Sequence, residues 1–342
     1  FLGIEILSIP LYVMAGSNKT DLRSNEASIK YFLMGAFATG FLLFGIALIY
    51  GSTGSFDVHV INTFSVANPK DLMFVMGIML MLVAMAFKVS LAPFHMWSPD
   101  VYQGAPSLIT AFMASVVKIA AFFAFFKVMN LAFAGSIKEW INILGVLVII
   151  TLLLANAMGL AQTNAKRMLA YSSVSHAGYL GLIFFGANSL SVYNLAFYLF
   201  AYSLATVGVF MTLIWVEKLK RETSFEAFKG LAKSEPLLAV VTAVSLLSMA
   251  GIPLTAGFVA KFNIFAQAMN GAAFLVLIAV IGSALSIAYY LKLIISMFFH
   301  TETTFKSSEK VSITYNIIAV FIIVAILAIG IYPDLFKVQF GL

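Results

Sequence analysis

Three lysines lie inside long apolar segments of this sequence, where they could carry chemistry. Lys88 occurs in VAMAFKVSLAPFHMW, Lys118 in MASVVKIAAFF and Lys261 in GFVAKFNIF. An ammonium in apolar surroundings is costly, so each lysine must reach water, find a partner or perform a task. Because burial favours the neutral amine over the ammonium, such lysines can exchange protons. The pattern therefore predicts proton transfer.

A carboxylate beside one of these lysines would make its protonation switchable. Glu5 is the one acidic residue, of 14, that lies within an apolar run and not at the edge of one. At about 4 Å, a carboxylate favours the ammonium by roughly 4 kcal/mol when the effective dielectric constant is about 20. Moving the carboxylate away would release a proton, and arginine could not titrate in this way. Hydroxyl and imidazole side chains would link the lysines, and the candidates are Ser90, Ser115, Ser175, His176 and Thr255.

Each of these residues also has a structural alternative. Lys118 and Lys261 could pair with backbone carbonyls, and Lys88, near the end of its run, could extend to water. His176 could be a packing residue inside its helix, and Glu5 could serve only as a residue at a helix end. The sequence alone leaves these alternatives open.

The composition places the chain in a membrane. Hydrophobic residues make up 62% of the 342 residues and charged residues 10%, whereas soluble domains are about half apolar and about one quarter charged. About ten apolar runs predict about ten transmembrane helices. These runs are residues 1–16, 28–50, 72–92, 106–129, 140–161, 168–187, 193–217, 236–270, 272–299 and 312–333. The runs lack the alternating polarity of a transmembrane barrel.

Two segments predict helices that break inside the membrane. Pro93 follows Lys88 closely, and AGIPLTAG, residues 250–257, places Pro253 and two glycines inside the longest run. Proline removes a backbone donor and ends or kinks a helix, and broken helices are tolerated where protein surrounds them. We therefore predict an all-α integral membrane protein with broken helices.

The loop charges predict the orientation of the chain. Twelve basic residues fall in one set of alternate loops: Lys19, Arg23, Lys30, Lys166, Arg167, Lys218, Lys220, Arg221, Lys229, Lys233, Lys306 and Lys310. The other set holds four: Lys70, Lys127, Lys138 and Lys337. Because basic loops stay in the cytoplasm, the first set should face the cytoplasm and the C-terminus should lie on the other side.

Several classes of function are disfavoured. The chain has no cysteine, so it forms no disulfide, thiolate metal site or iron–sulfur cluster. Its four histidines are scattered, at His59, His95, His176 and His300, without metal-ligand spacing. No nucleotide-binding motif is present, and the net charge of +6 lies in loops, so we expect no nucleic-acid partner.

Three blocks of sequence resemble a family, the antiporter-like membrane subunits of respiratory complex I. They are FKVSLAPFHMWSPDVYQGAPSLITAFMASVVKIAAF (87–122), KRMLAYSSVSHAGYLG (166–181) and LSMAGIPLTAGFVAKFNIF (247–265). PDVYQGAP resembles the subunit N branch, since subunits L and M and the Mrp-type antiporters favour Ala-His at Val101-Tyr102. The resemblance covers essentially the whole chain.

The resemblance implies a fold of fourteen helices in two inverted five-helix repeats, each with a broken helix. This chain would hold helices 5 to 14 and would lack about four preceding helices. Residues 1–134 would complete the first half with helices 5–8, and 135–300 would form the second half with helices 9–13. Residues 301–342 would be a loop and the C-terminal helix.

The resemblance also implies roles for individual residues. Lys88 matches the lysine of broken helix 7, and Glu5 matches its partner glutamate on helix 5. Lys118 matches the connecting lysine of helix 8, and Lys261 the terminal lysine of broken helix 12. A lysine at 261 fits subunit N better than subunit M, which carries glutamate there. Lys30 and His176 match secondary residues of the proton pathway.

The function implied is proton translocation as a membrane subunit of an NADH–quinone oxidoreductase. This chain would bind no redox cofactor and catalyse no redox step alone, and NADH, FMN, iron–sulfur clusters and quinone would belong to partner subunits. We expect a multi-pass protein of the bacterial inner membrane, in contact with lipid and other membrane subunits. The alternatives are a Mrp-type cation/proton antiporter subunit, a membrane hydrogenase subunit, and a non-conducting membrane scaffold.

Overall fold

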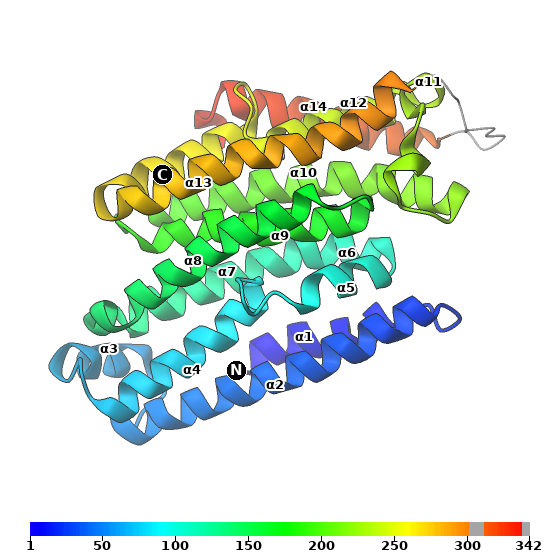
Figure 1. Ribbon diagram of the computed structural model, residues 1–342. Coiled ribbons are helices and arrows are strands. Elements are labelled where there is room, and N and C mark those ends of the chain that lie inside the picture. Colours follow the sequence, from blue (N-terminus) through cyan, green and yellow to red (C-terminus); the bar gives the residue numbers. More distant parts are fainter. Residues whose placement is uncertain (301–310, 337–342) are drawn as a thin grey trace.

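The computed structural model describes residues 1–300 and 311–336, and within them the chain is helical without a β-strand. Long helices lie side by side along one direction (Figure 1). Their bounds are α1 Leu2–Ala15, α2 Leu22–Thr53, α3 Val58–Ala67, α4 Leu72–Val89, α5 Trp97–Gly104, α6 Ser107–Phe112, α7 Lys118–Lys127, α8 Ile137–Leu160, α9 Ala165–Gly181, α10 Ser191–Lys220, α11 Leu231–Ser234, α12 Pro236–Ala250, α13 Ala256–Phe299 and α14 Ile313–Ile331. The predicted all-α class is confirmed.

The outer faces of these helices are apolar, as expected for a protein surrounded by lipid. Phe262, Phe274, Ile317 and Phe321 are among many large apolar side chains that are more than half exposed. Within the described residues, seven helical segments are long and apolar enough to cross a membrane. Such extensive apolar surface would be unfavourable in water. The chain is therefore a multi-pass membrane protein.

Both predicted helix breaks are present. Helix α4 ends at Val89 and α5 begins at Trp97, while α12 ends at Ala250 and α13 begins at Ala256. Protein groups satisfy backbone atoms freed at the first break: the Ala92 amide donates to Thr151 Oγ1 at 2.8 Å. At the second break Gly251 has a φ of 85°, a backbone conformation that glycine adopts readily because it has no Cβ.

Three features differ from the predicted helices. Helix α3, capped by the Asp57 side chain, was not predicted because its ten residues include polar ones. The expected boundary between the runs 236–270 and 272–299 is a kink within α13, where Ala272 has non-helical dihedral angles. A π-helical turn, Met113–Val117, lies between α6 and α7. The division at residues 134 and 300 stays a prediction.

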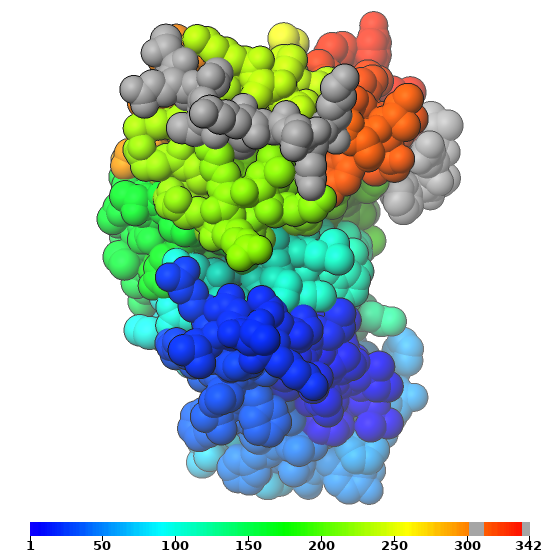
Figure 2. Space-filling model, turned by 90° about the vertical axis from the view of Figure 1, so that its right-hand side faces the viewer, coloured from blue at the N-terminus to red at the C-terminus, as the bar shows by residue number. Residues whose placement is uncertain are grey.

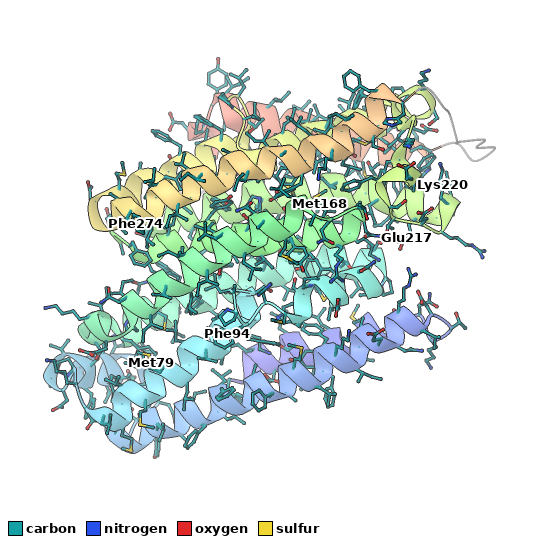
Figure 3. The ribbon with its side chains drawn as sticks, in the orientation of Figure 1. Met79, Phe94, Met168, Glu217, Lys220 and Phe274 are labelled. Carbon is teal, nitrogen blue, oxygen red and sulfur yellow. The ribbon has the colours of Figure 1, made fainter. Side chains whose placement is uncertain are left out.

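The predicted basic loops gather at one end of the molecule. The loop between α1 and α2, the start of α9 and the end of α10 lie together at the right of Figure 1. Figure 2 looks onto this end, with the α1–α2 loop in blue below the yellow-green segment that follows α10. Figure 3 labels Glu217 and Lys220 here and Phe274 at the opposite end. Lys306, Lys310 and Lys337 lie outside the described residues.

Candidate functional site

Glu5 on α1 and Lys88 on α4 lie next to each other. Glu5 Oε1 is 3.6 Å from Lys88 Nζ, and the two side chains are 13% and 10% exposed. The ammonium lies closer to two hydroxyl oxygens, Ser8 Oγ at 2.7 Å and Tyr12 OH at 3.2 Å. Glu5 Oε1 accepts a hydrogen bond from Thr39 Oγ1 at 2.9 Å. Lys88 therefore does not extend to water, and two hydroxyl oxygens lie nearer to its ammonium than the Glu5 carboxylate does.

Lys118 is buried at the start of α7, directly after the π-helical turn. Its ammonium donates to the carbonyl of Ser173 on α9 and to Ser173 Oγ, the latter at 2.6 Å. The Tyr202 ring of α10 lies 5.5 Å from the ammonium, a cation–π contact. The π-helical turn ends directly before Lys118, and such turns are frequent at functional sites.

Lys261 is buried in the second turn of α13 and faces the break after α12. It donates to the carbonyl of Ala250, the last residue of α12, at 3.0 Å and to Ser283 Oγ at 2.8 Å. The Tyr179 ring lies 4.6 Å from its ammonium. The broken helix thus supplies a carbonyl acceptor, because the last carbonyls of a helix have no partner within the helix, and Ser283 Oγ donates to the same carbonyl at 3.1 Å.

Helix α9 lies between Lys118 and Lys261. Ser173 contacts Lys118 and Tyr179 contacts Lys261, and His176 stands between them on the same helix. These three residues are buried and are spaced three apart, which places them on adjacent positions along the helix. The sequence alone did not show that α9 is the element joining the two lysines.

His176 is hydrogen-bonded on both ring nitrogens. Its Nδ1 lies 2.8 Å from Tyr198 OH and its Nε2 lies 3.4 Å from Tyr290 OH. Tyr290 OH is also bonded to Ser172 Oγ, at 2.5 Å. A small cavity of about 10 Å³ adjoins the imidazole and Tyr202. His176 is therefore part of a polar network and not only a packing residue.

A row of aromatic rings connects the region of Lys88 to that of Lys118. Tyr12 meets Tyr31 edge to face at 4.6 Å, and Tyr31 stacks on Trp97 at 4.5 Å. Trp97 then meets Tyr102 at 6.2 Å. Tyr102 OH lies 3.4 Å from Ser173 Oγ, the hydroxyl that contacts Lys118. Packing and hydrogen bonds are therefore continuous between the two lysine sites.

Lys30 belongs to a surface cluster at the basic end. Its Nζ lies 2.8 Å from Asp100 Oδ2 and 2.7 Å from Glu26 Oε1. Arg167 Nη1 lies 2.7 Å from the other oxygen of Asp100. Burial would raise the pKa of the Asp100 carboxyl, but the hydrogen bonds from Lys30 and Arg167 outweigh it and hold this pKa below its ordinary value. The cluster joins α2, α5 and α9.

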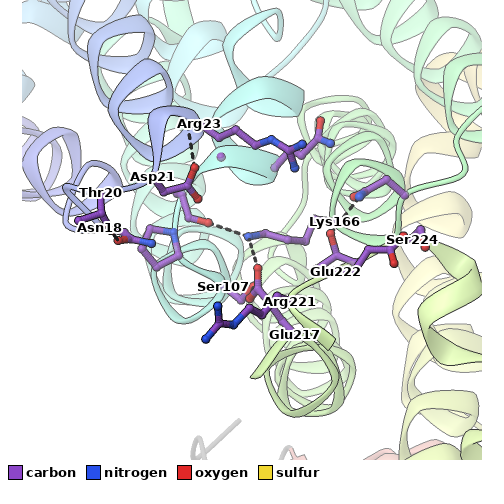
Figure 4. A pocket seen from close by; sticks show the side chains of 16 residues that line it. Asn18, Thr20, Asp21, Arg23, Ser107, Lys166, Glu217, Arg221, Glu222 and Ser224 are labelled. Atoms are coloured by element: carbon purple, nitrogen blue, oxygen red, sulfur yellow. Dashed lines mark hydrogen bonds and ion pairs between the residues drawn. The ribbon is translucent and has the colours of Figure 1, made fainter. Parts of the chain in front are cut away.

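A polar cavity of about 890 Å³ lies at the same end (Figure 4). Lys166, which is almost fully buried, donates to the Ala105 carbonyl at 2.7 Å and lies 3.3 Å from Glu217 Oε1. Ser107 donates to the other oxygen of Glu217. Arg23, Asp21, Arg221 and Glu222 also line the cavity. This cavity therefore gathers titratable side chains at the basic end.

The hydroxyls that contact the three lysines differ from all the candidates chosen from the sequence. Ser115 Oγ donates within its own helix to Ala111 and Ser175 Oγ donates to Asn156, while Ser90 ends α4 and Thr255 caps α13. The lysines contact Ser8, Tyr12, Ser173 and Ser283 instead. The sequence signal that could have indicated Ser173 is its position in the run SSVSH, three residues before His176.

No group of three or more histidine and acidic side chains gathers as a metal site in residues 1–300 and 311–336. Lys118 and Lys261 each contact a backbone carbonyl and a hydroxyl, and Lys88 contacts two hydroxyls and the Glu5 carboxylate. The carbonyl contacts agree with a structural role for Lys118 and Lys261, which the sequence had left open. The hydroxyl contacts agree with proton transfer, because a hydroxyl can both accept and donate a proton. The arrangement can hold and pass protons.

The fold and this site define a class: integral membrane proteins whose broken helices carry buried, titratable side chains, as in transporters. The family described as NADH:quinone oxidoreductase/Mrp antiporter, TM, matches residues 1–286, and the chain belongs to this family. NADH-quinone oxidoreductase subunit N of Cytophaga hutchinsonii is 46% identical over 98% of this chain and 73% of its own length.

Solved structures agree with this assignment. A chain of respiratory complex I from Thermus thermophilus is 36% identical with a TM-score of 0.82, covering 98% of this chain and 73% of that one. A chain of the archaeal membrane-bound sulfane sulfur reductase is 29% identical with a TM-score of 0.88, covering 97% and 68%. The resemblance seen in the three sequence blocks is therefore confirmed.

Proposed function

We propose that this chain is a proton-translocating membrane subunit of an NADH–quinone oxidoreductase of the complex I type. The observation that carries the proposal is the position of α9, whose Ser173 hydroxyl contacts Lys118 and whose Tyr179 ring contacts Lys261, with the His176 imidazole between them on the same helix. Buried lysines bonded to hydroxyls can change protonation state, which a fixed charge such as arginine cannot do. Kinship with subunit N supplies the oxidoreductase context.

In this proposal the Glu5–Lys88 pair is the switch. A change transmitted from quinone reduction elsewhere in the assembly moves the carboxylate relative to the ammonium, so the lysine gains or loses its proton. Lys118 receives the proton, and Ser173, His176 and ordered water carry it along α9 to Lys261. Lys30 is a secondary residue of the pathway, and its contact with Asp100 places it at the basic end.

The cofactors, partners and orientation follow from the same proposal. NADH, FMN, iron–sulfur clusters and quinone would be bound by partner subunits, and the chain would contribute proton transfer alone. The basic end would face the cytoplasm of a bacterial cell, with the C-terminus on the other side. The cavity beside Lys166 and Glu217 supports uptake of protons from that side.

Two other functions compete. A subunit of an antiporter or a membrane hydrogenase would share the fold, but among the solved structures the complex I chain is 36% identical to this chain and the sulfane sulfur reductase chain 29%. A non-conducting scaffold would not need three buried lysines bonded to hydroxyls. Identifying the subunits that co-purify with the full-length chain separates the first alternative from complex I.

The test of the proposal is Lys118→Ala in the full-length chain within its complex, with Lys127→Ala as the control. Lys127 is exposed at the other end of α7, so its removal should affect neither assembly nor pumping. For Lys118→Ala, native gels should show the assembled complex while proton release after an acid pulse falls severely. Normal pumping by Lys118→Ala would return this lysine to a structural role and refute the proposal.

A further inference from the structure

One face of α1 presents three polar groups to Lys88. Glu5, Ser8 and Tyr12 are spaced three and four residues apart, so they lie in a row along the helix. All three lie within 3.6 Å of the Lys88 ammonium, and only Glu5 carries a charge. The ammonium thus has two neutral acceptors in addition to its carboxylate.

The hydroxyls hold Lys88 more closely than the carboxylate does. Ser8 Oγ donates its own proton to the Ile4 carbonyl at 2.7 Å, which leaves its lone pairs for the ammonium. The Glu5 oxygen nearest to Lys88 is the one that accepts from Thr39. If the carboxylate withdrew, Ser8 and Tyr12 would still bind the ammonium where it stands.

The position of the Tyr12 hydroxyl depends on a glycine of α2. A Cβ on Gly35 would lie 2.2 Å from Tyr12 OH and 2.5 Å from Tyr12 Cζ, so any side chain there must displace the phenol. The ring cannot move freely, because it is 3% exposed and packs against Tyr31 and Phe32. Gly35 therefore provides the space that lets Tyr12 reach Lys88.

We propose that Tyr12 is a positioning residue for Lys88, holding the ammonium in place while the Glu5 carboxylate moves, and that Gly35 makes this contact possible. The inference rests on the proposed proton-translocating function and adds to it. If Glu5 were the only partner of Lys88, the ammonium would be free to bind another acceptor when the carboxylate moved away. The Tyr12 hydroxyl instead keeps the ammonium in place, so that the Glu5 carboxylate can pair with it again when it returns.

The test uses three variants of the full-length chain in its assembled complex, in inverted membrane vesicles energised with NADH. Tyr12→Phe removes the hydroxyl and keeps the ring, and Gly35→Ala pushes the phenol away from Lys88. Gly40→Ala is the matched control, because it makes the same change on the same helix where a Cβ would meet no atom within 4 Å. Assembly, quinone reduction and the pH profile of pumping are measured for each.

We expect Tyr12→Phe and Gly35→Ala to assemble and to pump fewer protons per quinone reduced. The alkaline limb of their pH profiles should move to lower pH by about one unit, because the ammonium has lost a hydrogen-bond acceptor. The double variant should resemble Gly35→Ala alone, since a Cβ at 35 also meets Tyr12 Cζ. Gly40→Ala should match the wild type.

A Tyr12→Phe profile that superimposes on the wild type overturns the inference, whatever happens to Gly35→Ala. If Gly35→Ala does not assemble, Tyr12→Phe decides alone, and a shifted profile for it supports the inference. Lys88→Ala distinguishes a failure of the proposed Glu5–Lys88 switch from a failure of the role proposed for Tyr12. Normal pumping by Lys88→Ala would refute the proposed switch as well, whereas lost pumping by Lys88→Ala beside an unchanged Tyr12→Phe would refute only the role of Tyr12.

Discussion

The Glu5–Lys88 pair gives the sharpest prediction about the mechanism. With 3.6 Å between Glu5 Oε1 and Lys88 Nζ, the carboxylate favours the ammonium by about 5 kcal/mol at an effective dielectric constant of about 20. Shortening the side chain by one methylene, as in Glu5→Asp, adds about 1.5 Å to the separation and removes about 1 kcal/mol of this attraction. Glu5→Ala removes all of it and leaves Ser8 and Tyr12 as the acceptors.

These magnitudes order the expected defects in NADH-driven pumping. Lys88→Ala and Glu5→Ala should be the most severe, because one lacks the titrating group and the other lacks the charge that switches it. Lys88→Arg should follow, since arginine keeps the positive charge but does not release its proton. Glu5→Asp should be mildest. All four should be compared in inverted vesicles containing equal amounts of assembled complex.

The assay must separate electron transfer from pumping. Quinone reduction and acidification of the vesicle interior are recorded on the same sample, with assembly checked on native gels. Lys88→Arg should assemble and still show a lowered proton-to-electron ratio. A Lys88→Arg variant that pumps at the wild-type rate would mean that Lys88 acts only as a fixed charge, and the switching mechanism would have to be abandoned.

Two further predictions concern the surface cluster and the cofactors. Because the pKa of Asp100 is held below its ordinary value, its contribution to stability is present above its unfolded pKa of about 4 and is lost as the pH falls through the folded value. Asp100→Asn should therefore destabilise the complex at pH 7 by about 1 kcal/mol, given the partial exposure of the cluster. Thermal melting of both proteins at pH 7 and at several pH values below 4 measures this, and a difference between them that grows on acidification would contradict it. The purified chain should show no flavin, haem or iron–sulfur absorbance, and a visible absorption band retained after removal of partner subunits would refute that expectation.

The sequence was sufficient to predict much of the fold because lipid imposes a simple rule. Apolar runs of about 20 residues must be helical, since backbone groups in hydrocarbon need internal partners. The break between α12 and α13 could also be predicted, because Pro253 cannot continue a helix and Gly251 can adopt a positive φ. Helix α3 escaped prediction because it is too short and too polar to resemble a span.

The sequence also indicates which charged residues are costly to place in a membrane. Lys88, Lys118 and Lys261 stand out because they lie in apolar runs, and the structure shows that Lys118 and Lys261 are buried and that the Lys88 side chain is 10% exposed. The partners of these lysines could not be predicted from the sequence. Hydroxyl side chains occur throughout the helices, and a serine that donates to its own helix cannot be distinguished in the sequence from one that binds a lysine. Ser115 and Ser173 illustrate this, since only the second contacts Lys118.

Which helices contact one another could be learned only from the packed structure. Ser173 lies 55 residues from Lys118, and Gly35 lies 23 residues from Tyr12, so neither contact is encoded in a local pattern. These contacts arise because helices packed closely through small residues bring side chains of distant segments together. The positions of the membrane-embedded lysines can be read from the sequence, whereas the groups that bind them depend on how the helices pack.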